Sequence, residues 1–268
     1  MKEPYQYHLI YGDGSTMEII RNGEADMVLT SPPYFSDNTE ALLKQPKKEQ
    51  KKVLQVREEI TTFALSLRPV YEEIKRILRP GGILALQVKD ITYGGFQLPL
   101  CSMHREMAES TGLMLLTRTF WHKYKRRSAS NHFVKNPRVG SFCADEVEEI
   151  MIFSDLPAEN KKQQLVDLPM DEIHDAVNPS WTFAPASGAG RVHPYQSPDG
   201  LVQRLIALYT VPGDLVVDPF AGAGTTLSMA VKMDRHAIGY EIDARTAEGA
   251  EPAIKRSIEK QAGRPRKP

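Results

Sequence analysis

Short apolar segments alternate with segments of helical hydrophobic spacing along most of this chain. Apolar runs that end at proline, glycine or a charged residue predict strands at 26–30, 83–88, 113–120, 147–153, 215–218 and 237–241. Apolar residues three and four positions apart predict helices within 67–78, 201–208, 225–233 and 244–259. Because strands that alternate with helices pair in parallel and have both faces covered, this pattern predicts an α/β fold with a mostly parallel, twisted sheet and helices on both faces.

One stretch, residues 155–190, interrupts the alternation. It is rich in proline, aspartate, serine and glycine, and Trp181 and Phe183 stand in it as isolated large aromatic residues. Such a composition is typical of loops, so we expect a small, irregular insertion in the α/β domain.

The composition is that of a globular protein. A length of 268 residues fits one large domain or one domain that carries an insertion. The chain has 41% hydrophobic and 25% charged residues, and its 34 basic residues balance 34 acidic ones. Net charge therefore gives no argument for a nucleic-acid partner, and any such argument depends on local basic runs such as 122–127.

No apolar stretch approaches the roughly 18 residues of a membrane span, and the polar N-terminus has no secretory signal. We therefore expect a soluble, cytoplasmic protein that does not contact a membrane. Cys101 and Cys143 form no CxxC pair, which predicts reduced thiols and no metal site.

A glycine-rich turn, DPFAGAGTT at 218–226, follows one predicted strand and opens a helix. Ligands of open α/β sheets bind at such a junction, where glycines allow close approach and the helix N-terminus presents N–H groups. A nucleoside triphosphate is disfavoured because no lysine follows Gly224, and a dinucleotide because Leu227 stands where its fingerprint needs a small residue. A nucleoside-like ligand without a pyrophosphate remains.

Glu241 ends the next predicted strand, at the spacing from Asp218 at which nucleoside-binding folds place a ribose-binding acid. S-adenosylmethionine fits this arrangement. It has a ribose and no phosphate, and its cationic sulfonium and amino groups would be attracted to Asp218.

The segment Ser31-Pro32-Pro33-Tyr34 ends the predicted strand at 26–30. Two consecutive prolines hold the backbone extended and so fix the directions of its carbonyls. The amine of a nucleobase is a weak nucleophile, and the Ser31 oxygen and the Pro32 carbonyl can accept its N–H groups and orient it toward a methyl donor. Tyr34 offers a face on which the base can stack. Since the target amine lies inside a duplex, the nucleotide has to be flipped out.

Together these stretches resemble the S-adenosylmethionine-dependent DNA amino-methyltransferases. The segment TSPPYF at 30–35 resembles the catalytic motif, and four further motifs follow in the order of the permuted beta group of that family: LRPGG at 78–82, HPYQSP at 193–198, the turn at 218–226 and IGYEID at 238–243.

The resemblance covers residues from about 8 to 258 apart from the insertion. It implies a Rossmann-like methyltransferase fold with a circularly permuted motif order. The implied parts are a catalytic half at 1–154, a target-recognition insertion at 155–190, a cofactor half at 191–260 and a basic tail at 261–268.

The resemblance also implies which residues bind the cofactor. Asp13 is expected at the adenine amine, and His193 and Gln196 in a segment that covers the methionine end. The rest of the expected set comes from the turn and the acid after it: Asp218, Phe220, Gly222, Gly224, Thr225, Thr226 and Glu241. The family often has a lysine near position 197, where this chain has Ser197.

Serine at position 31 resembles the cytosine-N4 enzymes, whereas adenine-N6 enzymes usually have aspartate or asparagine there. Adenine N6 of DNA, a base of RNA, and a non-catalytic DNA-binding module of the same fold remain alternatives.

The expected partner is double-stranded DNA. Contacts to phosphates and to the groove are predicted for Lys123, Lys125, Arg126, Arg127 and Arg138. A cognate restriction endonuclease is a candidate second partner, and the enzyme is expected to be a monomer or a homodimer.

Overall fold

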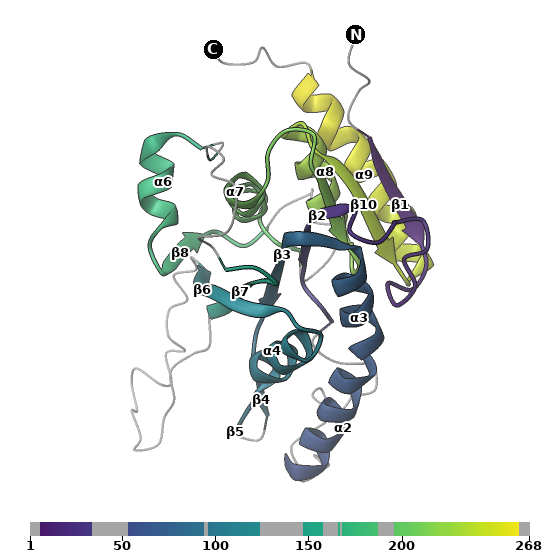
Figure 1. Cartoon of the computed structure of the whole chain (residues 1–268), viewed down its shortest axis with the longest axis vertical. Helices are drawn as coiled ribbons and strands as arrows, with labels where there is room; N and C mark the ends of the chain where they lie inside the picture. Colours follow the sequence, from purple (N-terminus) through teal and green to yellow (C-terminus); the bar gives the residue numbers. More distant parts are fainter. Residues whose placement is uncertain are drawn as a thin grey trace, which may run out of the picture.

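The computed structural model describes residues 6–33, 53–93, 96–123, 147–157, 166, 168–186 and 196–262. Eight strands within these residues form one sheet in the order β1-β10-β9-β2-β3-β7-β6-β8 (Figure 1). Their bounds are β1 (Tyr7–Tyr11), β2 (Ala25–Thr30), β3 (Leu78–Val88), β6 (Met114–Lys123), β7 (Val147–Ser154), β8 (Ser180–Phe183), β9 (Leu215–Asp218) and β10 (His236–Glu241). Of these eight strands, β7 alone is antiparallel to its neighbours. The predicted mostly parallel sheet is therefore confirmed.

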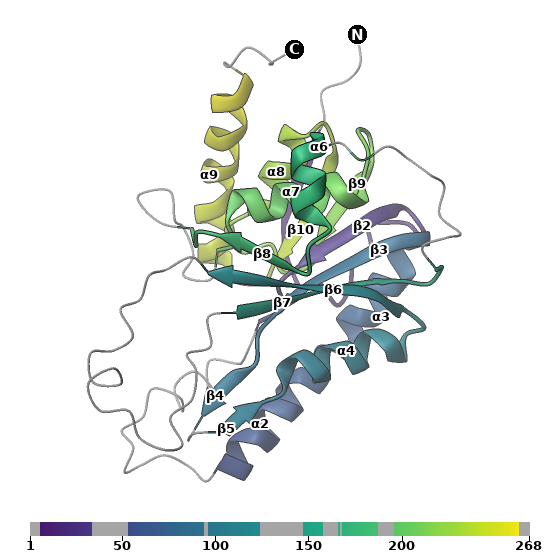
Figure 2. The same cartoon turned by 90° about the vertical axis from the view of Figure 1, so that its left-hand side faces the viewer.

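Helices cover both faces of the sheet (Figure 2). One face carries α2 (Val53–Ser66), α3 (Arg68–Ile77) and α4 (Leu100–Ser110), and the other carries α7 (Asp199–Tyr209), α8 (Thr225–Lys232) and α9 (Ala244–Ala262). Alternate residues of β2 enter the two cores, since Val28 packs with the first group of helices while Met27 and Leu29 pack with the second. Burial on both faces explains why the strand is nearly continuous in apolar residues.

The stretch 155–190 contains more regular structure than expected. A helix, α6 (Met170–Ala176), lies in it, and β8 pairs in parallel with β6 at the edge of the main sheet. Trp181 is buried, and the Trp121 indole donates to the Phe183 carbonyl at 2.9 Å. These elements correct the expectation of an irregular insertion. A four-residue strand in a proline-rich stretch forms only through pairing with a neighbour, and so the local sequence does not indicate it.

The sequence pattern also misses β1, α2, α4 and a small hairpin of β4 (Ile91–Tyr93) and β5 (Phe96–Leu98). At the other end, α9 includes the first two residues of the predicted tail, while 263–268 lie outside the described residues. In the part of the chain that the structure describes, no helix has the length and apolar character that crossing a membrane requires.

Candidate active site

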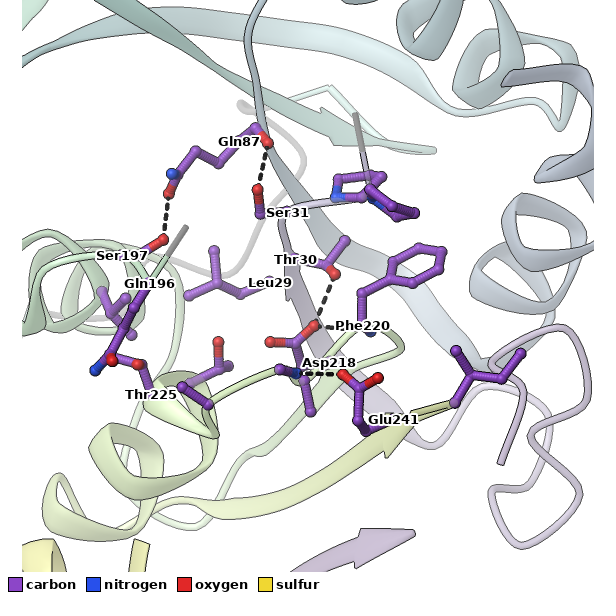
Figure 3. A pocket seen from close by; sticks show the side chains of 18 residues that line it. Leu29, Thr30, Ser31, Gln87, Gln196, Ser197, Asp218, Phe220, Thr225 and Glu241 are labelled. Atoms are coloured by element: carbon purple, nitrogen blue, oxygen red, sulfur yellow. Dashed lines mark hydrogen bonds between the residues drawn. The ribbon is translucent and has the colours of Figure 1, made fainter. Parts of the chain in front are cut away.

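The two motifs singled out in the sequence meet at the carboxyl edge of the sheet. Ser31 follows β2 directly, and the parallel neighbour β9 ends at Asp218. Residues from both motifs line one cavity of about 300 Å³, which is within the range of small-molecule sites (Figure 3). The predicted residues that line it are Ser31, Pro32, Pro33, Gln196, Asp218, Phe220, Gly222, Thr225, Thr226 and Glu241.

Asp218 is buried where β9 ends. Its Oδ1 accepts the Thr30 hydroxyl at 2.7 Å and the Phe220 N–H at 3.1 Å, so the bond from Thr30 ties the end of β2 to the end of β9 (Figure 3). Burial raises the pKa of Asp218 to about 6, although its hydrogen bonds, including one with Thr226, oppose the rise. The negative charge of Glu241 adds to the rise. Two neighbouring carboxylates make this end of the cavity attractive to a cationic ligand.

Glu241 joins the end of β10 to the glycine turn. Its Oε2 accepts the Gly222 N–H at 2.8 Å, and its Oε1 accepts the Asp243 N–H at 2.9 Å (Figure 3 shows the first bond). A carboxylate oxygen has more than one acceptor direction, so the side chain is held in place and can still accept ribose hydroxyls. The Glu241 carboxylate, which can bind a ribose diol, thus also holds the glycine turn in place.

Both glycines of the turn have a left-handed backbone, with φ of +49° at Gly222 and +73° at Gly224. Gly224 caps the N-terminus of α8, and its N–H reaches the Ala221 carbonyl at 2.8 Å. A Cβ on Gly224 would lie 2.3 Å from Cδ1 of Ile254, a buried residue of α9. Only glycine fits both the dihedral angle and the space.

We expect Gly224→Ala to destabilise the fold more than the same change at a left-handed glycine with open space around it. Gly112 is the matched control, because its φ is +91° and a Cβ there would meet no atom of the described residues within 4 Å. Gly112→Ala should lose about 1 kcal/mol from backbone strain. Gly224→Ala should lose about 2 to 4 kcal/mol because overpacking against Ile254 is added. Unfolding by denaturant measures both values, and equal losses would show that Ile254 moves aside without cost.

Asp13 lies on the loop after β1 and lines a second cavity of about 420 Å³. The two cavities adjoin, because both are lined by Pro33, Phe220, Glu241 and Ile242. Asp13 therefore lies in a cavity that adjoins the one lined by Ser31 and Asp218, and Glu241 belongs to both.

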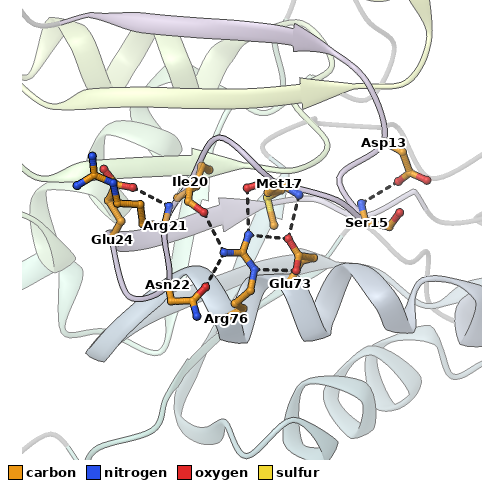
Figure 4. A network of polar contacts seen from close by, with 9 residues as sticks. All are labelled: Asp13, Ser15, Met17, Ile20, Arg21, Asn22, Glu24, Glu73 and Arg76. Atoms are coloured by element: carbon orange, nitrogen blue, oxygen red, sulfur yellow. Dashed lines mark hydrogen bonds and ion pairs between the residues drawn. The ribbon is translucent and has the colours of Figure 1, made fainter.

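Helix α3 fixes the loop that carries Asp13 (Figure 4). Arg76 donates to the carbonyls of Met17 at 3.0 Å and Ile20 at 2.9 Å, and its ion-pair partner Glu73 accepts the Met17 N–H at 2.9 Å. The hydrogen bonds from Arg76 hold the pKa of Glu73 below its usual value. The loop that carries Asp13 is thus held by the ion pair of Glu73 and Arg76, which lies outside the two cavities.

Ser31 is held by the neighbouring strand. Its hydroxyl donates to the main-chain carbonyl of Gln87, at the end of β3, at 3.1 Å (Figure 3). A hydroxyl has one hydrogen, so this bond directs that hydrogen toward β3 and makes the Ser31 oxygen an acceptor toward other groups.

Sequence reasoning missed Gln87, which also lines the cavity with its side chain. The Ser197 hydroxyl donates to Gln87 Oε1 at 2.9 Å, which gives Ser197 a contact at the position where the resembling family often has lysine. A signal was present in the sequence, because Gln87 is a polar residue in the otherwise apolar run at 83–88.

Six predicted residues lie outside the described part of the chain: Tyr34, Lys125, Arg126, Arg127, Arg138 and His193. Lys123 is described. Its ammonium group pairs with Glu148 and lies 5.0 Å from the centroid of the Trp121 ring. Lys123 therefore has a partner within the protein, and its contact with a DNA phosphate remains a prediction.

A mostly parallel α/β sheet, with a glycine turn and an acid at the ends of adjoining strands, is typical of proteins that bind nucleoside-type ligands. Within this class, the DNA methylase family N6_N4_Mtase matches residues 25–252. The chain belongs to this family and is thus a DNA methyltransferase.

Individual proteins show the same relationship. The Type II methyltransferase M.MjaI of Methanocaldococcus jannaschii is 28% identical, over 88% of this chain and 87% of that protein. TTHA0409 of Thermus thermophilus, in its crystal structure with S-adenosyl-L-methionine, is 25% identical with a TM-score of 0.71, over 95% of this chain and 94% of that one. PvuII DNA methyltransferase, which is cytosine-N4-specific, has a TM-score of 0.68 at 18% identity, over 96% and 93% of the two chains. The last likeness concerns the fold alone.

Proposed function

We propose that this DNA methyltransferase transfers a methyl group from S-adenosylmethionine to the N4 amine of cytosine in double-stranded DNA, as a member of the permuted beta group. The observation that carries the proposal is the shared cavity. Thr30 and Asp218 are 188 positions apart in the chain, yet they are hydrogen-bonded between the catalytic motif and the glycine turn.

The residues of the two adjoining cavities fit S-adenosylmethionine. Glu241 suits the ribose diol, Asp218 suits the cationic end, and Asp13 lies in the second cavity, where the adenine is proposed to bind. When bound, this cofactor supplies an activated methyl group on a sulfonium ion.

The protein's own contribution is to orient the amine. The Ser31 oxygen and the Pro32 carbonyl accept its two N–H groups and turn its lone pair toward the methyl group, while Tyr34 is assigned to stack on the base. A nitrogen–carbon bond forms as the carbon–sulfur bond breaks, the positive charge passes to the nitrogen, and that nitrogen releases a proton to water. Serine rather than an acid at position 31 favours cytosine as the substrate.

DNA recognition is assigned to residues 155–190 and to the basic residues Lys123, Lys125, Arg126, Arg127 and Arg138. Contacts to phosphates make DNA affinity fall with salt, whereas contacts to bases set the site. Because M.MjaI is named a Type II methyltransferase, we include a cognate restriction endonuclease among the candidate partners.

Methyl transfer to DNA from S-adenosylmethionine with a tritiated methyl group, followed by separation of the nucleosides, tests the proposal. We expect the label in N4-methylcytosine. Label in N6-methyladenine alone would show that the substrate base is wrong. No transfer to any DNA, with DNA binding intact, would instead favour a non-catalytic module. Sequencing of modified bases in a host that expresses the protein then gives the recognition site needed for kinetics.

A further inference from the structure

A chain of polar side chains crosses the sheet at the edge of the cavity. Glu148 on β7 is a charged residue and is only 4% exposed. Ile150 and Ile152, which share its face of the strand, lie in the apolar core with α7. One oxygen of Glu148 accepts the side-chain N–H of Gln87 on β3 at 2.5 Å, and the other pairs with Lys123 on β6.

These contacts determine which way the Gln87 amide faces. An ionised carboxylate only accepts hydrogen bonds, so the amide nitrogen lies toward Glu148, and the amide oxygen accepts the hydroxyl of Ser197. The nitrogen carries two hydrogens, and the bond to Glu148 uses one of them. The second N–H of Gln87 is left for another acceptor. Gln87 lines the cavity, and its main-chain carbonyl accepts the Ser31 hydroxyl.

We propose that this second N–H of Gln87 donates to N3 of the flipped cytosine, the ring nitrogen beside the target amine. Gln87 is then a specificity-determining residue and Glu148 the positioning residue that keeps its amide from turning over. The inference rests on the proposed function. Ser31 accepts from the amine and Gln87 donates to N3, so the pair selects cytosine over thymine, which presents a carbonyl and an N3–H and reverses both directions. Adenine presents an amine beside an acceptor ring nitrogen as cytosine does, so the selection made by this pair is against thymine.

The burial of Glu148 supports a role beyond packing. The Glu148 side chain is 5% exposed whereas that of Lys123 is 29% exposed, so the carboxylate is the buried member of the pair. Burying a carboxylate is expensive even when it is paired, and an apolar side chain of similar volume would fill the same space at lower cost. Without the carboxylate, the Gln87 amide could exchange its donor and acceptor ends, and the base edge would then meet an oxygen.

The test compares kcat/KM for duplexes that carry cytosine or 3-deazacytosine at the target position. Replacing N3 by C–H changes the reactivity of the amine equally for every enzyme variant, so the comparison between variants isolates the hydrogen bond. We expect Gln87→Leu to lower kcat/KM on cytosine about 10-fold. We also expect the loss caused by 3-deazacytosine to be about 10-fold larger for the wild type than for Gln87→Leu.

Glu148→Gln should show a reduced sensitivity to 3-deazacytosine, because it no longer fixes the amide. Glu149→Gln is the matched control. Its side chain points to the other face of the sheet and pairs with Arg118, so both duplexes should react as with the wild type. Gln87→Met, which keeps the length of the side chain without an N–H, should behave as Gln87→Leu. Calorimetric binding of S-adenosylmethionine establishes that each variant is folded.

The inference is wrong if Gln87→Leu and Gln87→Met retain the full sensitivity of the wild type to loss of N3. In that case the proposed function stands, since the wild type still methylates cytosine. A wild-type enzyme that transfers no methyl group to cytosine in any duplex would overturn both proposals.

Discussion

Ser31→Ala is expected to lower kcat about 100-fold, because a fixed group that stabilises the charge developing in a transition state contributes about 100- to 1,000-fold. The amine would lose an acceptor that β3 holds in place through the Gln87 carbonyl. The affinity for S-adenosylmethionine should stay within about twofold of the wild type, since uniform binding and transition-state binding are separate contributions. Single-turnover methyl transfer gives the rate, and calorimetry gives the affinity.

The control for this variant is Ser110→Ala. The Ser110 hydroxyl bonds the Met107 carbonyl at 2.8 Å within α4, and Ser110 does not line either cavity of the site. It should leave rate and affinity unchanged. A Ser31→Ala enzyme that transfers methyl groups as fast as the wild type would remove Ser31 from the mechanism, and a joint loss of rate and cofactor affinity would indicate damage to the cavity instead.

The part of the fold from β9 to α9 is well predicted from the sequence because its signals are local. The strand at 215–218 agrees with β9 as observed, and the helix at 225–233 ends one residue later than α8. A glycine marks the boundary between the turn and α8. Gly224 has a left-handed backbone conformation and is the N-cap of the helix.

Elements that depend on distant partners are missed. The strand β1 begins and ends with tyrosines, and among the described strands it pairs only with β10, from the opposite end of the chain. The strand β8 is four residues long, and its one partner in the described part of the sheet is β6. Periodicity within a segment carries no information about such neighbours, and so short edge strands are read as loops.

The same reason explains what was predicted of the site. Ser31 and Asp218 belong to motifs whose residue types indicate their chemistry. The parallel pairing of β2 with β9 brings the two motifs together. Gln87 and Glu148 carry no motif. Their contact depends on the register of β3 against β7, where Gln87 faces Ile150 and so reaches Glu148 diagonally, and this register is a property of the folded sheet.

The second large effect concerns pH. Because a cationic ligand prefers the ionised form of Asp218, and because burial raises the pKa of Asp218 to about 6, affinity for S-adenosylmethionine should weaken as the pH falls through 6. We expect the dissociation constant to rise about 10-fold between pH 8 and pH 5, since only about a tenth of the carboxyl groups are ionised one unit below the pKa. Calorimetric titrations across this range measure the change.

Asp218→Asn should remove this pH dependence and weaken binding about 100-fold at pH 8, as expected for the loss of a buried charged contact. Asp218→Asn should weaken cofactor binding but raise the stability of the free protein at pH 8. An acid whose pKa is raised by folding favours the folded state when protonated, and this contribution is lost as the pH rises from the unfolded value toward 6. At pH 8 the free Asp218→Asn protein should therefore unfold at a higher temperature than the wild type, which separates weakened binding from a damaged fold.

Asp214→Asn is the matched control, because Asp214 stands just before β9, at the opposite end of that strand from Asp218, and its pKa is also raised by burial. Its carboxylate accepts the Val211 N–H at 2.8 Å and does not line the site. Cofactor affinity and its pH profile should be unchanged in this variant. If Asp218→Asn bound S-adenosylmethionine with the wild-type affinity at pH 8, the carboxylate would not contact the cationic end of the cofactor, and the assigned direction of the ligand across the two cavities would have to be reversed.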